Sequence, residues 1–259
     1  MSLARRVRDK LRGPGFHLVR RAVLLGRGLL FLGRRYRCPC CGWSLRSFTG
    51  PWSILASNPD GYCPRCNAKA RHRRLWLFLE ERTGLLSADA TRLLEVAPWW
   101  AMSRRLMGAP NVSFVGLDLQ RTGPHVTVVG DATRIPLQSG SVDATLCIHT
   151  LEHIEDDRAA MGELHRVLRP GGWAVVSVPL DLDAPTFEDP SITDPEERLR
   201  SFGERGHVRA YGLDIRDRLE AAGFSVQLDR AADVPGEVRA RFGLRVDENI
   251  FFCRKATGG

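Results

Sequence analysis

Short apolar runs alternate with segments of helical periodicity over about the last 170 residues of this 259-residue chain. Strands that are joined through helices run parallel, and a parallel sheet needs helices on both faces. We therefore expect an α/β domain that binds its ligand at the carboxyl ends of the strands. The predicted strands are Arg92–Val96, Val112–Leu117, Val126–Val129, Ala144–Ile148, Trp173–Val178, Ser225–Leu228 and Ile250–Cys253. The predicted helices are Ala68–Glu81, Ala101–Met107, Asp156–Leu168 and Leu213–Ala222.

Five of the seven cysteines lie within residues 38–66. Cys38 and Cys41 form one C-x-x-C pair, Cys63 and Cys66 form another, and Cys40 is left over. Two such pairs present four thiolates to one tetrahedral ion, which predicts a zinc ribbon with a structural role. An iron-sulfur site or a redox dithiol pair would use the same residue types and is the alternative. We place the neighbouring His72 on a solvated basic helix face, in the run Arg71–Arg74.

The positive charge of the chain is concentrated at its N-terminus. The whole chain has 38 Lys and Arg against 30 Asp and Glu, and residues 1–37 hold 11 of the basic residues with a single acid. The remaining 27 basic and 29 acidic residues nearly cancel, so basicity belongs to an arm. That arm has helical potential and suits RNA phosphates, a membrane surface or packing on its own protein. Its apolar stretch, 22–32, is interrupted by Arg27 and is too short to span a membrane.

Four motifs follow the ends of predicted strands: Leu93-Leu-Glu95-Val-Ala97, Gly116-Leu-Asp118-Leu119, Gly130-Asp131-Ala132-Thr-Arg-Ile-Pro136, and Leu168-Arg-Pro-Gly-Gly172. With Ser141-Val-Asp143 and Leu151-Glu-His153, the series resembles that of class I S-adenosylmethionine (SAM) dependent methyltransferases over about Leu93 to Lys255. The resemblance implies a Rossmann-like, mostly parallel seven-stranded sheet whose last strand, near Glu248–Arg254, is antiparallel. It also implies SAM as the cofactor, bound by Glu95, Ala97, Asp118, Leu119, Asp131, Ala132 and His149.

The first loop departs from the family pattern. That loop is usually rich in glycine because the backbone passes close to the cofactor, but here it reads Ala97-Pro98-Trp99-Trp100. A similar loop accompanies a zinc ribbon in an uncharacterised subgroup of methyltransferase-like proteins. The segments Arg71–Trp76 and His207–Gly212 also resemble that subgroup.

Two other enzyme classes fit poorly. His149-Thr-Leu-Glu152-His153 matches the H-x-x-E-H metalloprotease pattern, which needs a helix that carries both histidines. Here the pattern directly follows a predicted strand. A nicotinamide-binding fold would need G-x-G-x-x-G, which this chain lacks.

Methyl transfer from a sulfonium depends mainly on alignment of the two reactants, with a general base where the acceptor is a hydroxyl. Histidine is the side chain best suited to that role near neutral pH. The candidates are His149, His153 and His207, of which His207 is preferred because it lies in the long insert 181–212. We expect this polar insert to form a lid over the acceptor site.

We therefore expect a basic arm at 1–36, a zinc ribbon at 37–68 and a methyltransferase-like domain at 69–259. The predicted activity is methylation of oxygen or nitrogen in a small-molecule or glycan acceptor, in the cytoplasm or at the periphery of a membrane. Two alternatives stay open. The first is an RNA methyltransferase that uses the arm, the ribbon and Arg71–Arg74 to hold phosphates, and the second is an adaptor that has lost the cofactor.

Overall fold

The computed structural model describes residues 14–50, 58, 61–87 and 90–258, with the backbone alone for 14–20. Residues 1–13 of the predicted arm therefore lie outside the described residues. The helices are α2 (Pro14–Leu30), α3 (Ala70–Phe78), α4 (Trp100–Leu106), α5 (Asp157–Val167), α6 (Pro195–Phe202), α7 (Ile215–Ala221) and α8 (Gly236–Phe242). The strands are β1 (Leu32–Arg37), β2 (Ser44–Leu45), β3 (Thr91–Val96), β4 (Val112–Asp118), β5 (Val128–Val129), β6 (Val142–Ile148), β7 (Leu168–Ser177), β8 (Phe187–Glu188), β9 (Arg209–Ala210), β10 (Phe224–Asp229) and β11 (Ile250–Lys255).

A seven-stranded sheet forms the centre of the molecule, in the order β10-β11-β7-β6-β3-β4-β5. Strands β7, β6, β3, β4 and β5 are parallel, and β11 is antiparallel to both of its neighbours. This is the mostly parallel Rossmann-like sheet that the motif series predicts, with the antiparallel strand where it was expected. Each of the seven strands overlaps the segment predicted for it.

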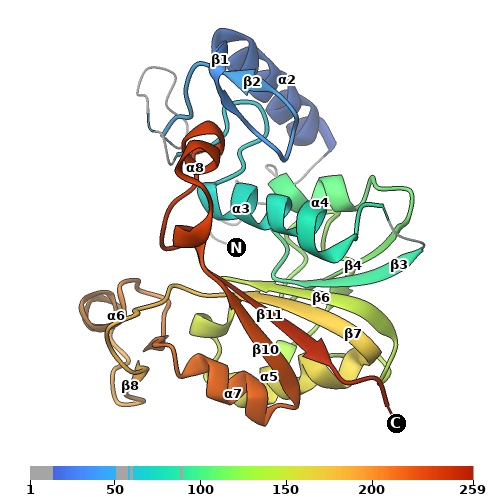
Figure 1. Cartoon of the computed structure of the whole chain (residues 1–259), viewed down its shortest axis with the longest axis vertical. Helices are drawn as coiled ribbons and strands as arrows, with labels where there is room; N and C mark the ends of the chain where they lie inside the picture. The colour runs from blue at the N-terminus through green and yellow to red at the C-terminus, as the bar shows by residue number, and fades with distance from the viewer. Residues whose placement is uncertain (1–13, 51–57, 59–60, 88–89, 259) are drawn as a thin grey trace, which may run out of the picture.

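Each face of the sheet has its own apolar core. On one face, α5 and α7 pack with residues such as Leu94, Leu164 and Leu219. On the opposite face, α3 and α4 lie between the sheet and the β1-β2 hairpin (Figure 1). That second core runs without interruption from Phe48 beside the cysteines, through Leu75 of α3, to Phe252 of β11. The cysteine-rich segment and the sheet therefore share one core.

The expectation that Arg71–Arg74 forms a solvated basic face is wrong. Within this run, Arg73 is completely buried, and His72 and Arg74 are 3% and 5% exposed. The Arg73 guanidinium donates hydrogen bonds to four backbone carbonyls, and it lies 3.7 Å from the centre of the Phe48 ring. The four acceptors are those of Gly61, Ala68, Phe242 and Gly243. Burial without a carboxylate partner is tolerated because carbonyl oxygens accept from every guanidinium nitrogen. Two of the arginines assigned to phosphate binding are therefore unavailable for it.

Residues 181–212 contain a helix and a small hairpin that the sequence pattern did not predict. Asp194 caps α6 by accepting from the amides of Glu196 and Glu197, and Pro195 occupies the first turn. The strands β8 and β9 pair antiparallel. Glu188 of β8 binds Arg218 of α7 and Arg209 of β9, and these arginines lower the pKa of Glu188 to about 2. The insert is thus attached to the domain by the ion pair between the exposed Glu188 and the buried Arg218.

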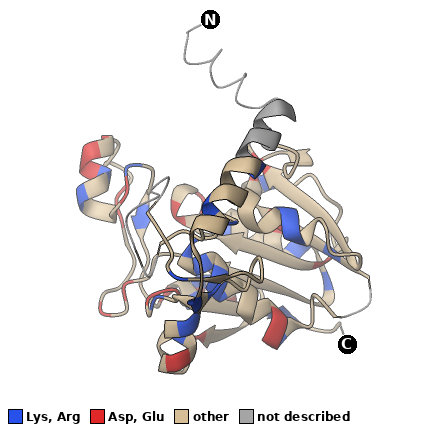
Figure 2. Ribbon diagram, turned by 90° about the horizontal axis from the view of Figure 1, so that it is seen from above, with Lys and Arg blue, Asp and Glu red and all other residues tan. Residues whose placement is uncertain are grey.

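Charges are mixed over the domain that surrounds the large sheet, where acidic and basic residues are interspersed (Figure 2). Among the described residues, no helix combines the length and the apolar character needed to cross a membrane.

Candidate functional site

The register of the parallel strands brings the predicted cofactor-binding residues to one edge of the sheet. Val96 of β3 lies beside Leu117 of β4 on one side and beside Cys147 of β6 on the other. The residues that follow therefore leave the sheet together, with neighbouring strands about 5 Å apart. The amide of Gly130 donates to the carbonyl of Asp118, so the turn that carries Asp131 lies next to β4. The edge thus presents His149, Ala97, Asp118 and Asp131 in that spatial order.

Ala97 and His149 both have left-handed backbone conformations, with φ of 50° and 49°. Non-glycine residues adopt such angles rarely, and they often do so at functional sites. In the loop after β3, Ala97 thus adopts a backbone conformation that glycine adopts at no steric cost. Its amide donates to the carbonyl of Leu117, 2.8 Å away.

Asp118 and Asp131, at the carboxyl edge of the sheet, are more exposed than Glu95. Asp118 is half-buried, and within the described residues its carboxylate accepts one hydrogen bond, at Oδ1 from the amide of Gln120. Its Oδ2 accepts no hydrogen bond from the part of the chain that the structure describes. Asp131 is exposed and accepts from the amide of Thr133, and it precedes the buried Ala132. Leu119 is 68% exposed and extends the apolar surface beside Asp118.

Glu95 is enclosed rather than presented to the edge. It is 4% exposed, and the hydroxyl of Ser103 in α4 donates to its Oε2 at 2.7 Å. Burial raises the pKa of Glu95 to about 7, against the opposing effect of Ser103. The carboxylate thus faces α4.

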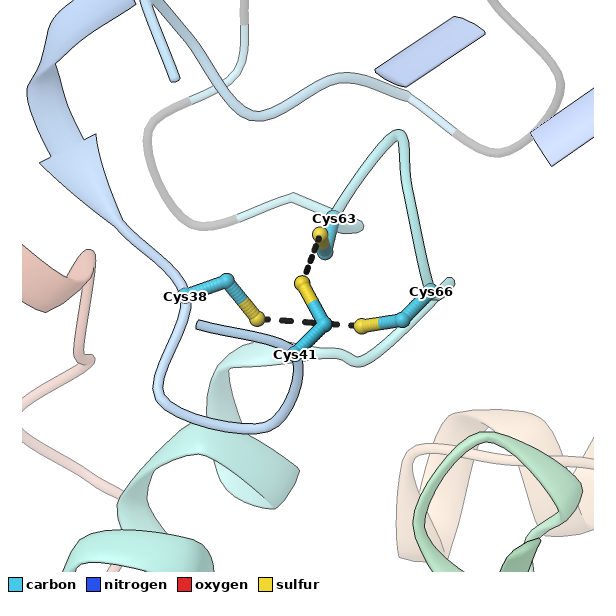
Figure 3. A group of neighbouring side chains, drawn as sticks. All are labelled: Cys38, Cys41, Cys63 and Cys66. Atoms are coloured by element: carbon cyan, nitrogen blue, oxygen red, sulfur yellow. Dashed lines mark hydrogen bonds between the residues drawn. The ribbon is translucent and has the colours of Figure 1, made fainter. Parts of the chain in front are cut away.

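The four paired cysteines converge as the spacing predicts (Figure 3). The Sγ atoms of Cys38 and Cys66 are 3.7 Å apart, and those of Cys41 and Cys63 are 3.8 Å apart. A tetrahedral zinc ion with Zn–S bonds of about 2.3 Å separates its sulfurs by about 3.8 Å. The donor set and spacing therefore fit zinc. Cys40 points elsewhere, since its thiol donates to the carbonyl of His72.

Both C-x-x-C turns are built in the same way. The amide of Gly42 donates to the carbonyl of Cys38, and the amide of Asn67 donates to the carbonyl of Cys63, each at 2.8 Å. Gly42 and Asn67 both have positive φ, 75° and 65°. Gly and Asn are the residues that adopt this conformation most readily.

The predicted histidines meet in a large cleft between the cysteine-rich segment and the 181–212 insert. This cleft has a volume of about 1240 Å³, and His149, His153 and His207 line it together with Glu152. The rings of His153 and His207 are 4.7 Å apart, edge to face. Tyr62 and Lys69 form part of the opposite wall, where the Lys69 ammonium lies 5.1 Å from the centre of the Trp99 ring.

His149 connects the cleft to the cofactor edge. Its Nδ1 is 3.5 Å from Oε1 of Glu152, and its Nε2 is 3.3 Å from Oε2 of Glu248. Burial lowers the pKa of His149, but the two carboxylates outweigh it and raise that pKa above the ordinary value. Sequence reasoning missed Glu248 and the importance of Glu152. No local pattern links Glu248 to a histidine 99 positions earlier, whereas Glu152 lies inside the noted H-x-x-E-H stretch.

The strand order and the acids at the carboxyl edge define the class: this is the fold of class I, SAM-dependent methyltransferases. Residues 109–176 match the family model described as a methyltransferase domain. Over these residues the chain is similar to methyltransferases, and its sheet has their fold.

Individual relatives support the same class. A Mycolicibacterium smegmatis protein described as a probable S-adenosylmethionine-dependent methyltransferase is 30% identical over 128 residues, 49% of this chain and 46% of its own. An O-methyltransferase of Pyrenophora dematioidea is 28% identical over 131 residues, 46% of this chain and 49% of its own. The chain thus spans about half the length of these curated relatives.

Solved structures share the fold at low identity. The [4+2]-cyclase SpnF has a TM-score of 0.53 at 18% identity, covering 82% of this chain and 88% of its own. A SAM-dependent methyltransferase of Mesorhizobium loti has a TM-score of 0.51 at 17% identity, covering 70% and 97%.

Proposed function

We propose that this chain transfers the methyl group of SAM to an oxygen or nitrogen of a small-molecule or glycan acceptor. The observation that carries the proposal is the position of the histidine-lined cleft, which begins at His149 on the cofactor edge of the sheet. The O-methyltransferase named above supports oxygen as the acceptor atom.

In this proposal Asp118 accepts from the ribose and Asp131 from the adenine amino group, with Ala132 and Leu119 beside the nucleoside. Ala97 shapes the turn under the cofactor, and Glu95 supports that turn through Ser103 and α4. Bound SAM supplies an electrophilic methyl group on a sulfonium. The protein's own work is to align the acceptor in the cleft and to exclude water.

An acceptor hydroxyl would lose its proton to the histidines of the cleft. His149, His153 and His207 are the candidates, and the carboxylates of Glu152 and Glu248 stabilise a protonated His149. The insert 181–212 closes one side of this site, and Gly212 shows how tightly it packs, since a Cβ there would lie 2.1 Å from the carbonyl oxygen of Ala184.

We also propose zinc at Cys38, Cys41, Cys63 and Cys66, with the ribbon at 37–68 and the methyltransferase domain at 69–259. Because four thiolates close a tetrahedral site, this metal would stabilise the fold and leave no position for substrate.

The first test is calorimetric titration of SAM into zinc-replete protein. We expect micromolar binding, and we expect Asp118→Ala to weaken it at least tenfold, since two ribose hydrogen bonds to a charged group are lost. Asp143→Ala is the matched control, because Asp143 is half-buried at the opposite, amino-terminal end of β6. Absence of binding at millimolar SAM would refute the proposal, and equal affinity of the two variants would show that the ribose site lies elsewhere.

A further inference from the structure

Three side chains in the cleft, two of them the candidate bases His153 and His207, form a cluster with the composition of a metal site. Glu152, His153 and His207 each offer one donor atom, and these three atoms lie within 4.8 Å of one another. They come from two segments, the turn after β6 and the insert 181–212. Two imidazoles with one carboxylate is a donor set that divalent transition metals prefer.

Glu152 is the most unusual member of the cluster. It is 1% exposed, and within the described residues neither of its carboxylate oxygens has a hydrogen-bond donor. Two histidine nitrogens lie near this carboxylate, Nδ1 of His149 at 3.5 Å and Nε2 of His207 at 4.0 Å. Protonated His149 compensates Oε1 of Glu152 in part, but neither oxygen accepts a hydrogen bond, and a buried carboxylate in this state is usually paired more closely with a cation or bound to a metal.

Both histidines are held as metal-binding histidines usually are. His153 Nδ1 lies 3.0 Å from the carbonyl oxygen of Gly206, and His207 Nδ1 lies 3.1 Å from that of Phe202. A carbonyl oxygen only accepts, so Nδ1 of each ring carries a proton, and a neutral ring then has its lone pair on Nε2. Nε2 of His207 lies 3.4 Å from Oε2 of the exposed Glu204, so a metal ion there would replace a proton shared with that carboxylate. Donation of the second nitrogen to a backbone carbonyl fixes the tautomer and orients the ring toward a metal.

The two segments that carry the donors are fixed to each other. Arg209 donates to the carbonyls of Leu151, Ile154 and Glu155, which frame Glu152 and His153. The amide of Val208, next to His207, donates to the carbonyl of Glu152 at 2.9 Å. The donor atoms are thus brought together by the fold before any ligand binds, which lowers the cost of binding.

We infer that Glu152, His153 and His207 form a second metal site, for a divalent transition cation such as Zn²⁺, separate from the four-cysteine site. Ligands on a tetrahedral ion with bonds of about 2.1 Å lie about 3.4 Å apart, so the side chains need to move inward by up to about 1 Å. Three protein ligands on the wall of an open cleft leave coordination positions for another molecule. That this molecule is the acceptor rests on the proposed function, whereas metal binding itself does not.

The test is calorimetric titration of Zn²⁺ alone into protein whose four-cysteine site is already loaded, as shown by one zinc per chain in elemental analysis. We expect one additional ion per chain, and we expect Glu152→Gln and His153→Ala each to weaken its binding at least about tenfold. Glu155→Gln is the matched control, since this glutamate lies three residues further on and is exposed. Far-UV circular dichroism verifies the fold of each variant, and the exposed His153 provides a variant with little structural cost.

Absence of a second zinc ion, or equal affinity in the Glu152→Gln, His153→Ala and Glu155→Gln proteins, would overturn the inference. Because the titration contains neither SAM nor acceptor, its outcome is independent of whether the chain proves to be a methyltransferase.

Discussion

At the scale of single residues, Ala97 is unusual because it is a non-glycine residue with a left-handed backbone in the loop after β3. An alanine in the left-handed region costs about 1–2 kcal/mol. Glycine would relieve this strain, but it also raises the conformational entropy of the unfolded chain, which offsets part of the stabilisation. We therefore expect Ala97→Gly to stabilise the protein by about 0.5–1 kcal/mol in urea denaturation. Ala159→Gly, in the helical conformation of α5, should destabilise it by about 1 kcal/mol. Destabilisation by Ala97→Gly would contradict the strained turn.

Glu95 gives a second prediction at this scale, because its carboxyl is buried against Ser103 with a pKa of about 7. A carboxyl whose pKa is higher in the folded than in the unfolded state binds more protons when folded, so it costs stability as pH rises from about 4.5 to 7. The cost is about 3 kcal/mol at 1.36 kcal/mol per pKa unit. Glu95→Gln keeps an acceptor for Ser103 and does not ionise.

The measurement for Glu95 is urea denaturation of both proteins at pH 5.5 and pH 8. We expect the Gln variant to gain stability relative to the wild type as pH rises, whereas the exposed Glu155→Gln should give no such gain. A constant difference between wild type and Glu95→Gln across this range would mean that Glu95 ionises normally.

At the scale of elements, α3 joins the cysteine-rich segment to the sheet, and Arg73 is its central contact. Arg73→Met would remove a donor from four backbone carbonyls, of which that of Ala68 keeps the amide of Cys63, so we expect a loss of at least about 3 kcal/mol. Arg82→Met, just beyond α3 and exposed, should change stability by less than about 0.5 kcal/mol. The measurement is the denaturant midpoint of each variant. Similar midpoints for the two variants would show that Arg73 does not stabilise the fold in this way.

The same scale separates what the sequence could predict from what it could not. Periodicity located the seven strands because a strand buried on both faces reads as a continuous apolar run, as in Leu146 of β6. The sequence pattern predicted an exposed Arg73 because charged side chains usually lie in solvent. It is buried because its guanidinium is bound by carbonyls from residues as distant in sequence as Gly243. The helix α6 was missed within a polar insert, although Asp194-Pro195 is a recognisable start signal.

The candidate site also has a part that the sequence predicted and a part that it did not. The C-x-x-C spacing predicted the four converging thiols because those ligands are local pairs. The cleft could only be predicted in part, since Glu152 meets His207 through packing of the insert, and Glu248 reaches His149 from the loop before β11. Contacts of this kind depend on the folded topology and leave no periodic signal.

At the scale of the whole molecule, the shared core links the four-cysteine site to the stability of the domain built on the seven-stranded sheet. Phe48 beside the cysteines and Phe252 in β11 belong to one apolar cluster, with α3 between them. Zinc binding energy is folding energy wherever the unfolded chain forms no site. Loss of the proposed zinc should therefore destabilise the sheet domain as well as the ribbon.

Removal of zinc by a chelator, or Cys63→Ser, should lower the thermal midpoint of the whole chain, because the core over α3 loses its support. Cys40→Ser is the matched control: its thiol lies outside the quartet and donates to the carbonyl of His72, so the four-cysteine site should keep its zinc and the midpoint should stay close to that of the wild type. The measurement combines the zinc content of that site with thermal unfolding followed by far-UV circular dichroism. If the chelated protein unfolds at the wild-type temperature, the ribbon is an independent unit. Loss of that zinc ion from Cys40→Ser would instead make Cys40 a ligand.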